Sequence, residues 1–99
     1  MGKGSEVLVG AISSSLNEVA PGLKAVLEAY LRATLNRGLE VAYDDPKAFK
    51  EAVAKLFGEY SARLLELVII DRLRAQFEWA GEPATLEEVV ERIKDAYGD

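Results

Sequence analysis

The sequence predicts an all-α fold, a compact bundle of about five helices, and three observations predict it. Apolar residues recur mostly at intervals of three and four, which is the spacing of one helix face. Proline and glycine divide the chain into segments of helical length. The 99 residues are 49% hydrophobic and 29% charged, as is typical of a globular protein. We therefore treat residues 1–99 as a single helical domain.

The first expected helix lies near the N-terminus. One apolar face recurs there at spacings of four, four and three residues: Leu8, Ile12, Leu16 and Val19. This spacing keeps the four side chains on the same side of a helix. We expect residues 1–4 to precede the helix as a disordered end.

A second helix is expected to open at Pro21, because proline at the first turn of a helix loses no hydrogen bond. Gly38 suits a left-handed helix end. The apolar stripe between them comprises Leu23, Leu27, Tyr30, Leu31 and Thr34. The following residues 39–46, LEVAYDDP, are predicted to form a loop held in place by its apolar side chains.

The third helix has the clearest start in the chain. Asp45 stands before Pro46, which is the order of an N-cap and a first helical residue. Its apolar face contains Phe49, Val53, Leu56 and Phe57, and Gly58 ends or bends it.

The fourth helix is expected over about residues 59–78. Its middle, LVII at 67–70, contains β-branched residues that favour strands. Helix formers flank this run without a turn residue, and a strand of about twenty residues would far exceed the usual length. We therefore expect a helix, stopped by Gly81 and Pro83.

A capping box predicts the start of the last helix. Thr85 stands at the cap position and Glu88 follows three residues later. The apolar face behind it contains Leu86, Val90, Ile93 and Tyr97, and Gly98 closes the helix.

The fourth helix carries large apolar residues all round its circumference, with Leu67 and Val68 in the middle of it. A helix of this kind is normally buried on every side, so we expect it at the centre of the bundle and Leu67 in the core. Either the other four helices ring it, or one face is left for a protein partner, with a homodimer as the expected arrangement. The candidate interface lies away from the main leucine row: Ile70, Leu73 and Phe77, flanked by Asp71 and Arg74.

The composition excludes several kinds of site. The chain has no cysteine and no histidine, which removes thiolate nucleophiles, most zinc sites and the commonest general base. It has no glycine-rich phosphate loop, and Asp71 with Arg74 forms a helix-surface ion pair rather than a catalytic pair. We therefore expect no catalytic residue, no metal and no cofactor, and we do not expect an enzyme.

Charge and hydropathy limit the partners. Residues 1–43 carry four positive and four negative side chains, so the net charge of −5 lies wholly in residues 44–99. An acidic half repels phosphate, so nucleic acid is not expected. No apolar run approaches the roughly 20 residues that span a bilayer, so membrane insertion is not expected. No signal peptide is apparent, and a chain without cysteine suits the cytoplasm.

Two segments, APGLKAVLEAYL and DDPKAFKEAVAKLFGEYSARLLELVIIDRL, resemble a small archaeal helical family, the Nitrosopumilus output domain. The resemblance covers about residues 20–75 and rests on Pro21-Gly22, Tyr30-Leu31, Pro46, Phe49, Phe57-Gly58, Ala62 and Leu65-Glu66. It implies a regulatory or output module without an assigned catalytic activity, and it supplies no functional residues.

The functional expectation is a non-enzymatic regulatory or protein-interaction module that self-associates. The alternative is a small-molecule or lipid-binding helical protein with an apolar cavity. A mass that depends on concentration would favour the first, and a ligand retained through purification would favour the second.

Overall fold

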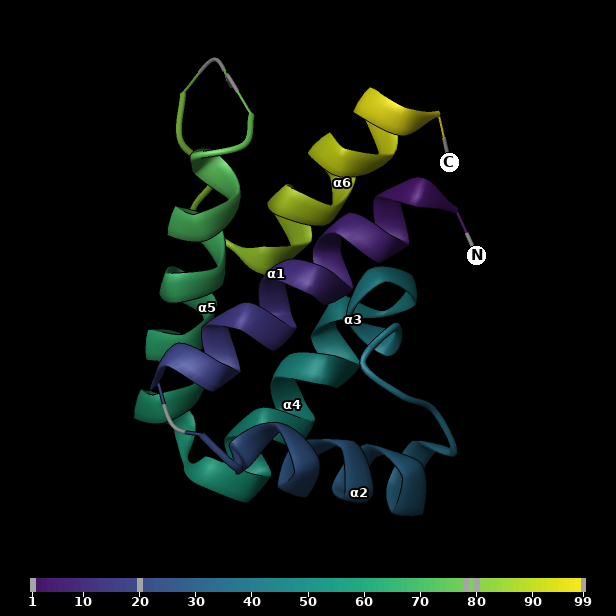
Figure 1. Ribbon diagram of the computed structural model, residues 1–99, viewed down its shortest axis with the longest axis vertical. Helices are drawn as coiled ribbons and strands as arrows, with labels where there is room; N and C mark the ends of the chain where they lie inside the picture. Colours follow the sequence, from purple (N-terminus) through teal and green to yellow (C-terminus); the bar gives the residue numbers. More distant parts are fainter. Residues whose placement is uncertain (1, 20, 78, 80, 99) are drawn as a thin grey trace.

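The computed structural model describes residues 2–19, 21–77, 79 and 81–98. This part of the chain contains six helices and no strand, which confirms the all-α fold (Figure 1). The helices are α1 (Lys3–Val19), α2 (Leu23–Leu35), α3 (Val41–Asp44), α4 (Pro46–Phe57), α5 (Glu59–Arg74) and α6 (Leu86–Tyr97).

α1 crosses the middle of the molecule. It packs against α2, α3, α5 and α6, and α4 packs against α5 on one side and α2 and α3 on the other. α5 runs along the left edge of the bundle in Figure 1, where it contacts α1, α4 and α6. α5 is therefore covered by neighbouring helices on part of its circumference, and the ring of four helices that the sequence suggests does not form around it.

α1 begins earlier than the sequence predicts. The helix starts at Lys3, and Gly4 and Ser5 are buried, so the expected disorder of residues 1–4 is wrong for residues 3 and 4. Met1 lies outside the described residues. The small side chains of Gly4 and Ser5 allow the first turn to approach its neighbours closely, which explains why it is ordered.

α2 ends two residues before the predicted glycine. Asn36 takes the left-handed conformation (φ 55°), and its N–H donates to the Arg32 carbonyl at 3.1 Å. Asparagine is the residue other than glycine that adopts this conformation most readily. At Gly38 the N–H donates to Glu40 Oε2 at 2.6 Å, and a Cβ would lie 2.8 Å from Glu40 Oε1, a contact that a small shift of that flexible side chain would relieve.

The predicted loop at 39–46 contains a single helical turn, α3. Three of its four residues, Val41, Ala42 and Tyr43, are buried. Alternating apolar and polar residues there suggest extended backbone, but burying all three side chains on one side requires a turn. Packing against α1 and α4 thus decides the conformation of this segment.

The two N-caps are confirmed. The Asp45 carboxylate accepts a hydrogen bond from the Ala48 N–H at 3.1 Å, with Pro46 as the first residue of α4. The Thr85 hydroxyl accepts from the Glu88 N–H at 3.2 Å, and the Glu88 carboxylate accepts from the Ala84 N–H at 2.7 Å. Both N-caps could be predicted from the sequence because a cap depends only on neighbouring residues.

α5 ends at Arg74, four residues before the predicted end. The N–H groups of Gln76 and Phe77 both donate to the Leu73 carbonyl, which closes the helix with a turn. Phe77 then stacks on Trp79, with ring centroids 5.1 Å apart, and meets Tyr97 edge-on at 6.2 Å. The contact with Tyr97 of α6 accounts for the turn of the chain away from the helical path at Phe77. Glu78 lies outside the described residues.

The core side of α5 also differs from the prediction. The buried apolar residues are Leu65, Ile69, Ile70 and Leu73, whereas Leu67 is 44% exposed and Val68 is half-buried. The expectation that Leu67 lies in the core is therefore wrong. It sits on the side of α5 that no other helix covers.

We expect Leu73→Ala to lower the free energy of unfolding by about 2–5 kcal/mol, because it would leave a cavity at a fully buried site. Leu67→Ala on the same helix should change it by only about 0.5 kcal/mol, because that side chain is partly in solvent. Urea unfolding of both variants, followed by circular dichroism, measures the difference. Equal destabilisation of the two variants would contradict the assignment of the two faces.

Candidate functional site

Glu66 is a buried carboxylate in the middle of α5, with only 5% of its side chain exposed. It lies three, four and seven residues before Ile69, Ile70 and Leu73, so it shares their core face. A charged group at such a position is costly unless it is paired and hydrogen-bonded.

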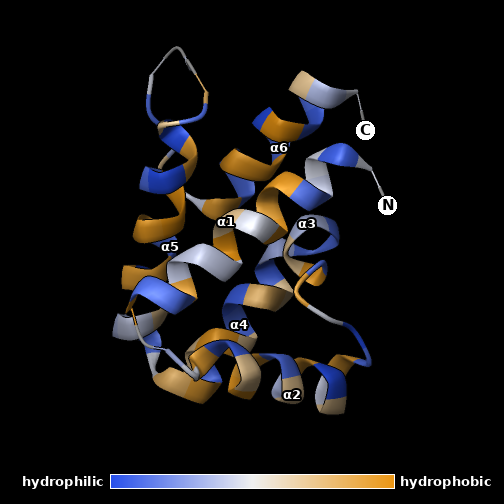
Figure 2. Ribbon diagram, in the orientation of Figure 1, coloured by the Kyte–Doolittle hydropathy of each residue, from blue (hydrophilic) through white to orange (hydrophobic). Residues whose placement is uncertain are grey.

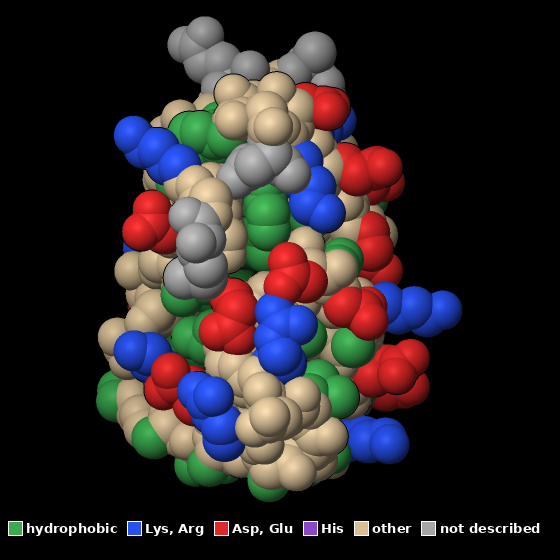
Figure 3. Space-filling view, turned by 90° about the vertical axis from the view of Figure 1, so that its right-hand side faces the viewer, with side chains coloured by type: hydrophobic (Ala, Val, Ile, Leu, Met, Phe, Trp, Pro, Cys, Tyr) green, Lys and Arg blue, Asp and Glu red, His purple; other side chains and the backbone are tan. Residues whose placement is uncertain are grey.

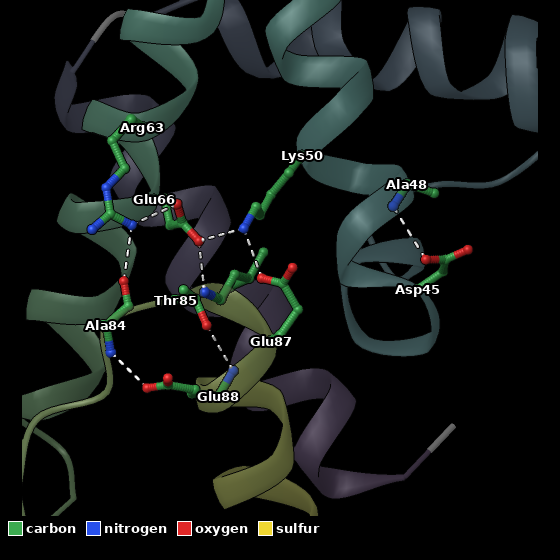
Figure 4. A network of polar contacts seen from close by, with 10 residues as sticks. Asp45, Ala48, Lys50, Arg63, Glu66, Ala84, Thr85, Glu87 and Glu88 are labelled. Carbon is green, nitrogen blue, oxygen red and sulfur yellow. Dashed lines mark hydrogen bonds and ion pairs between the residues drawn. The ribbon is translucent and has the colours of Figure 1, made fainter.

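Three donors from three parts of the fold converge on this carboxylate (Figure 4). The Leu86 N–H, at the start of α6, donates to Glu66 Oε2 at 2.7 Å. Lys50 of α4 places its Nζ 3.0 Å from the same oxygen, and Arg63 Nη1 lies 2.9 Å from Glu66 Oε1. Both carboxylate oxygens are thus satisfied, and the group connects α4, α5 and α6.

The pKa of Glu66 reflects two opposing effects. Burial by itself would raise the pKa, because it disfavours the charged form. The hydrogen bonds from Leu86, Arg63 and Lys50 outweigh burial and hold the pKa below its ordinary value of 4.5. The carboxylate is therefore ionised at neutral pH.

The same donors make further contacts toward the surface. Lys50 Nζ also lies 2.7 Å from Glu87 Oε1, and Arg63 Nη1 also donates to the Ala84 carbonyl at 2.8 Å. Burial would lower the pKa of Lys50, but its hydrogen bonds to Glu87 and Glu66 raise it above 10.5. Lys50 is consequently a charged ion-pair partner and not a nucleophilic amine.

An open hollow of about 310 Å³ lies beside this network, between α4 and α5. Its lining is Lys47, Lys50, Glu51, Ala54, Glu59, Ala62, Arg63, Glu66 and Glu87. Positive and negative groups alternate there, and the innermost charges already pair with each other. Among the described residues no cluster of three His, Cys, Asp or Glu side chains could hold a metal ion. We assign the network a structural role: it attaches α6 to α4 and α5.

A second hollow, of about 220 Å³, has an apolar character and lies where α1, α2, α4 and α5 meet. We call it the apolar groove, and its lining is Leu16, Val19, Leu23, Val53, Phe57, Ser61, Leu64 and Leu65. Val19 and Leu64 at its mouth are each 46% exposed. The groove can therefore accept an apolar group from outside the molecule.

Four residues follow one another along the uncovered side of α5, and we call them the α5 stripe: Tyr60, Leu64, Leu67 and Asp71. Tyr60 is 84% exposed, and Leu64 and Leu67 are about half as exposed. Hydrophobic residues occur in successive turns of α5 at the left edge of Figure 2. On the face shown in Figure 3, at the opposite side of the molecule, Lys and Arg are interspersed with Asp and Glu.

The structure separates the predicted interface residues instead of grouping them. Ile70 and Leu73 belong to the core of the same chain, and Phe77 is partly buried against Trp79 and Tyr97. A seam centred on these three residues is therefore wrong. Asp71 and Arg74 are exposed and pair with each other at 2.5 Å, as their spacing predicts, and Arg74 also pairs with Glu82.

Sequence reasoning missed Glu66 as the centre of a network. Its register is only a partial signal: the residues three, four and seven positions after it are large and apolar, but so are the residues at the same intervals before Asp71 and Arg72. Lys50 and Glu87 carry no comparable signal, because each looks like an ordinary residue on the polar side of its own helix.

No helix within the described ranges combines the length and the hydropathy needed to cross a bilayer.

Comparisons with known proteins agree on the fold. A family model described as Nitrosopumilus output domain 5 matches residues 2–95, nearly the whole chain. A solved structure, "Crystal structure of PH0832 from Pyrococcus horikoshii OT3", is 60% identical in sequence and superposes with a TM-score of 0.91. The match covers 98% of this chain and 99% of that one. No curated protein matches the chain.

We expect Glu66→Gln to destabilise the protein by about 1.5–3 kcal/mol at neutral pH, because a neutral amide replaces a carboxylate that accepts charge-assisted hydrogen bonds. Since the pKa of Glu66 is lowered by folding, the stability it contributes is present above pH 4.5 and lost as the pH falls through the lower, folded-state value. The difference between the two proteins should therefore shrink in acid. Denaturant titrations from neutral to strongly acidic pH measure it.

Glu91→Gln, at an exposed position of α6, is the matched control and should leave stability nearly unchanged at every pH. A Glu66→Gln variant that is as stable as the control at neutral pH would show that the network does not hold the helices together.

Proposed function

We propose, from the premise that this chain belongs to the Nitrosopumilus output domain 5 family, that it is a non-enzymatic protein-interaction module. The observation that carries the proposal is the open apolar surface formed by the α5 stripe and the apolar groove beside it. The family description, an output domain, fits a regulatory module that acts by contacting another protein.

The arrangement of the exposed side chains supports a protein partner. Single exposed leucines are common on protein surfaces, but Leu64 and Leu67 are adjacent on one helix face and Leu64 also lines the groove. Tyr60 adds an aromatic ring with a polar hydroxyl at the end of the same face. Apolar anchors beside a pocket, with a tyrosine and charges at the rim, are typical of protein interfaces.

A small apolar molecule or a lipid chain in the groove is the second candidate. Its support is the groove's apolar lining. Its weakness is size, because a volume of about 220 Å³ is below the roughly 300–1,000 Å³ of most small-molecule sites. Mass spectrometry of the gently purified protein under native conditions would detect a retained ligand.

We place this interaction in the cytoplasm and with protein rather than nucleic acid. The support is compositional: the chain lacks cysteine, and its carboxylates outnumber its basic side chains by 17 to 12.

A photoreactive p-benzoylphenylalanine in place of Tyr60 should form protein cross-links in the cells that make this protein. The position is highly exposed, and the new side chain is also aromatic, so the fold should tolerate the change. The same amino acid in place of Glu91 on α6 is the control and should cross-link far less. Denaturing electrophoresis and mass spectrometry identify the products.

The cross-links should depend on the leucines of the stripe. Combining the probe at position 60 with Leu64→Ser and Leu67→Ser should reduce the cross-linked fraction about tenfold or more, corresponding to a loss of about 1.4 kcal/mol of binding free energy. Equal cross-linking with and without the leucines, or no more than at position 91, would contradict the proposed function.

A further inference from the structure

The intervals between the residues of the α5 stripe are the same when counted from either end of the helix. Tyr60, Leu64, Leu67 and Asp71 are separated by four, three and four residues. These intervals keep all four on one side of a helix, and the two leucines lie at the middle. At 1.5 Å per residue the stripe is about 16 Å long, with its centre between Leu64 and Leu67.

A symmetric spacing fits a two-fold axis through that centre. If a second α5 packs antiparallel on the first, Leu64 of each copy lies opposite Leu67 of the other. Tyr60 of each copy then lies opposite Asp71 of the other. Such an interface is isologous, meaning that one patch is complementary to itself.

The two ends of the stripe carry complementary polar groups, as an antiparallel pair of α5 helices requires. Near the start of α5, the Tyr60 hydroxyl is a hydrogen-bond donor. Near the end, Asp71 is an acceptor and Arg74 is basic, and all of these side chains are exposed. Antiparallel packing brings the Tyr60 hydroxyl of each copy to the Asp71 carboxylate of the other.

A parallel pair would be unfavourable. It would place Asp71 against Asp71 and Arg74 against Arg74, so like charges would meet at the C-terminal end of the stripe. The charges therefore select the direction of packing, and the leucines supply the buried contact.

We infer that the occupant of the α5 stripe is a second copy of this chain, bound antiparallel about a two-fold axis between Leu64 and Leu67. This inference rests on the proposed function and names the partner. It also moves the dimer seam to the side of α5 opposite the core residues Ile70 and Leu73.

The first test is the mass in solution. The unmodified chain should be a dimer at high concentration and dissociate on dilution, and Leu67→Glu should make it monomeric with unchanged helical circular dichroism. Leu67 is 44% exposed, so the charge does not enter the core. Val26→Glu, at a 48% exposed apolar position of α2, is the matched control and should leave the dimer intact.

The second test determines the direction of packing. Because the chain has no cysteine, Leu64→Cys and Leu67→Cys chains each carry a single thiol. When the two variants, distinguished by a tag, are mixed and mildly oxidised, disulfides should join position 64 to position 67 at least severalfold more than either position to itself. An excess of 64–64 and 67–67 products would overturn the antiparallel arrangement.

The outcomes distinguish this inference from the proposed function. A chain that stays monomeric at high concentration, or a dimer that survives Leu67→Glu, would overturn the inference. If the probe at position 60 nevertheless cross-links to another protein and needs the leucines to do so, the proposed function stands without self-pairing. If neither occurs, both are wrong.

Discussion

The ionised carboxylate of Glu66 constrains the whole arrangement of the helices. A buried charge is tolerated only with several donors, and here they come from the first backbone amide of α6, from Lys50 of α4 and from Arg63 of its own helix. These groups converge only if α4, α5 and α6 lie at one relative placement. Apolar packing alone permits small shifts between helices, whereas a carboxylate with fixed donor distances does not.

One side of α5 packs into this core, so the opposite side faces outward. Glu66, Ile69, Ile70 and Leu73 face inward together because of their spacing, so the residues about half a turn away must face outward. Leu64 and Leu67 are among them, and the helices in the described part of the chain leave each of them nearly half exposed. The apolar surface therefore follows from the geometry of a helix with more apolar residues than one face can hold.

Local chemistry made part of this structure predictable, and tertiary packing decided the rest. The Asp45 and Thr85 caps depend on residues within one turn, and both were predicted correctly. The turn at Val41–Asp44, the end of α5 at Arg74 and the order at Gly4 all depend on contacts with distant helices. For the candidate site, the apolar excess of α5 was visible in the sequence, but the side that stays open was not, because a helical wheel does not show which neighbours are present. The register of Glu66 does not distinguish it from Asp71 or Arg72, and its donors at Lys50 and Leu86 come from other helices.

Gly58 joins α4 to α5 with no other residue between them. Its N–H donates to the Ala54 carbonyl and ends α4, while its own carbonyl accepts from the Ala62 N–H and begins α5. Its backbone angles, φ 94° and ψ 157°, belong to a region open essentially to glycine alone. Because only one residue joins the two helices, a single inserted or deleted residue would turn α5 by about 100° about its own axis and move its core residues out of register. Differences in length among members of this family should therefore accumulate between α5 and α6, and the corner at Gly58 should keep a constant length.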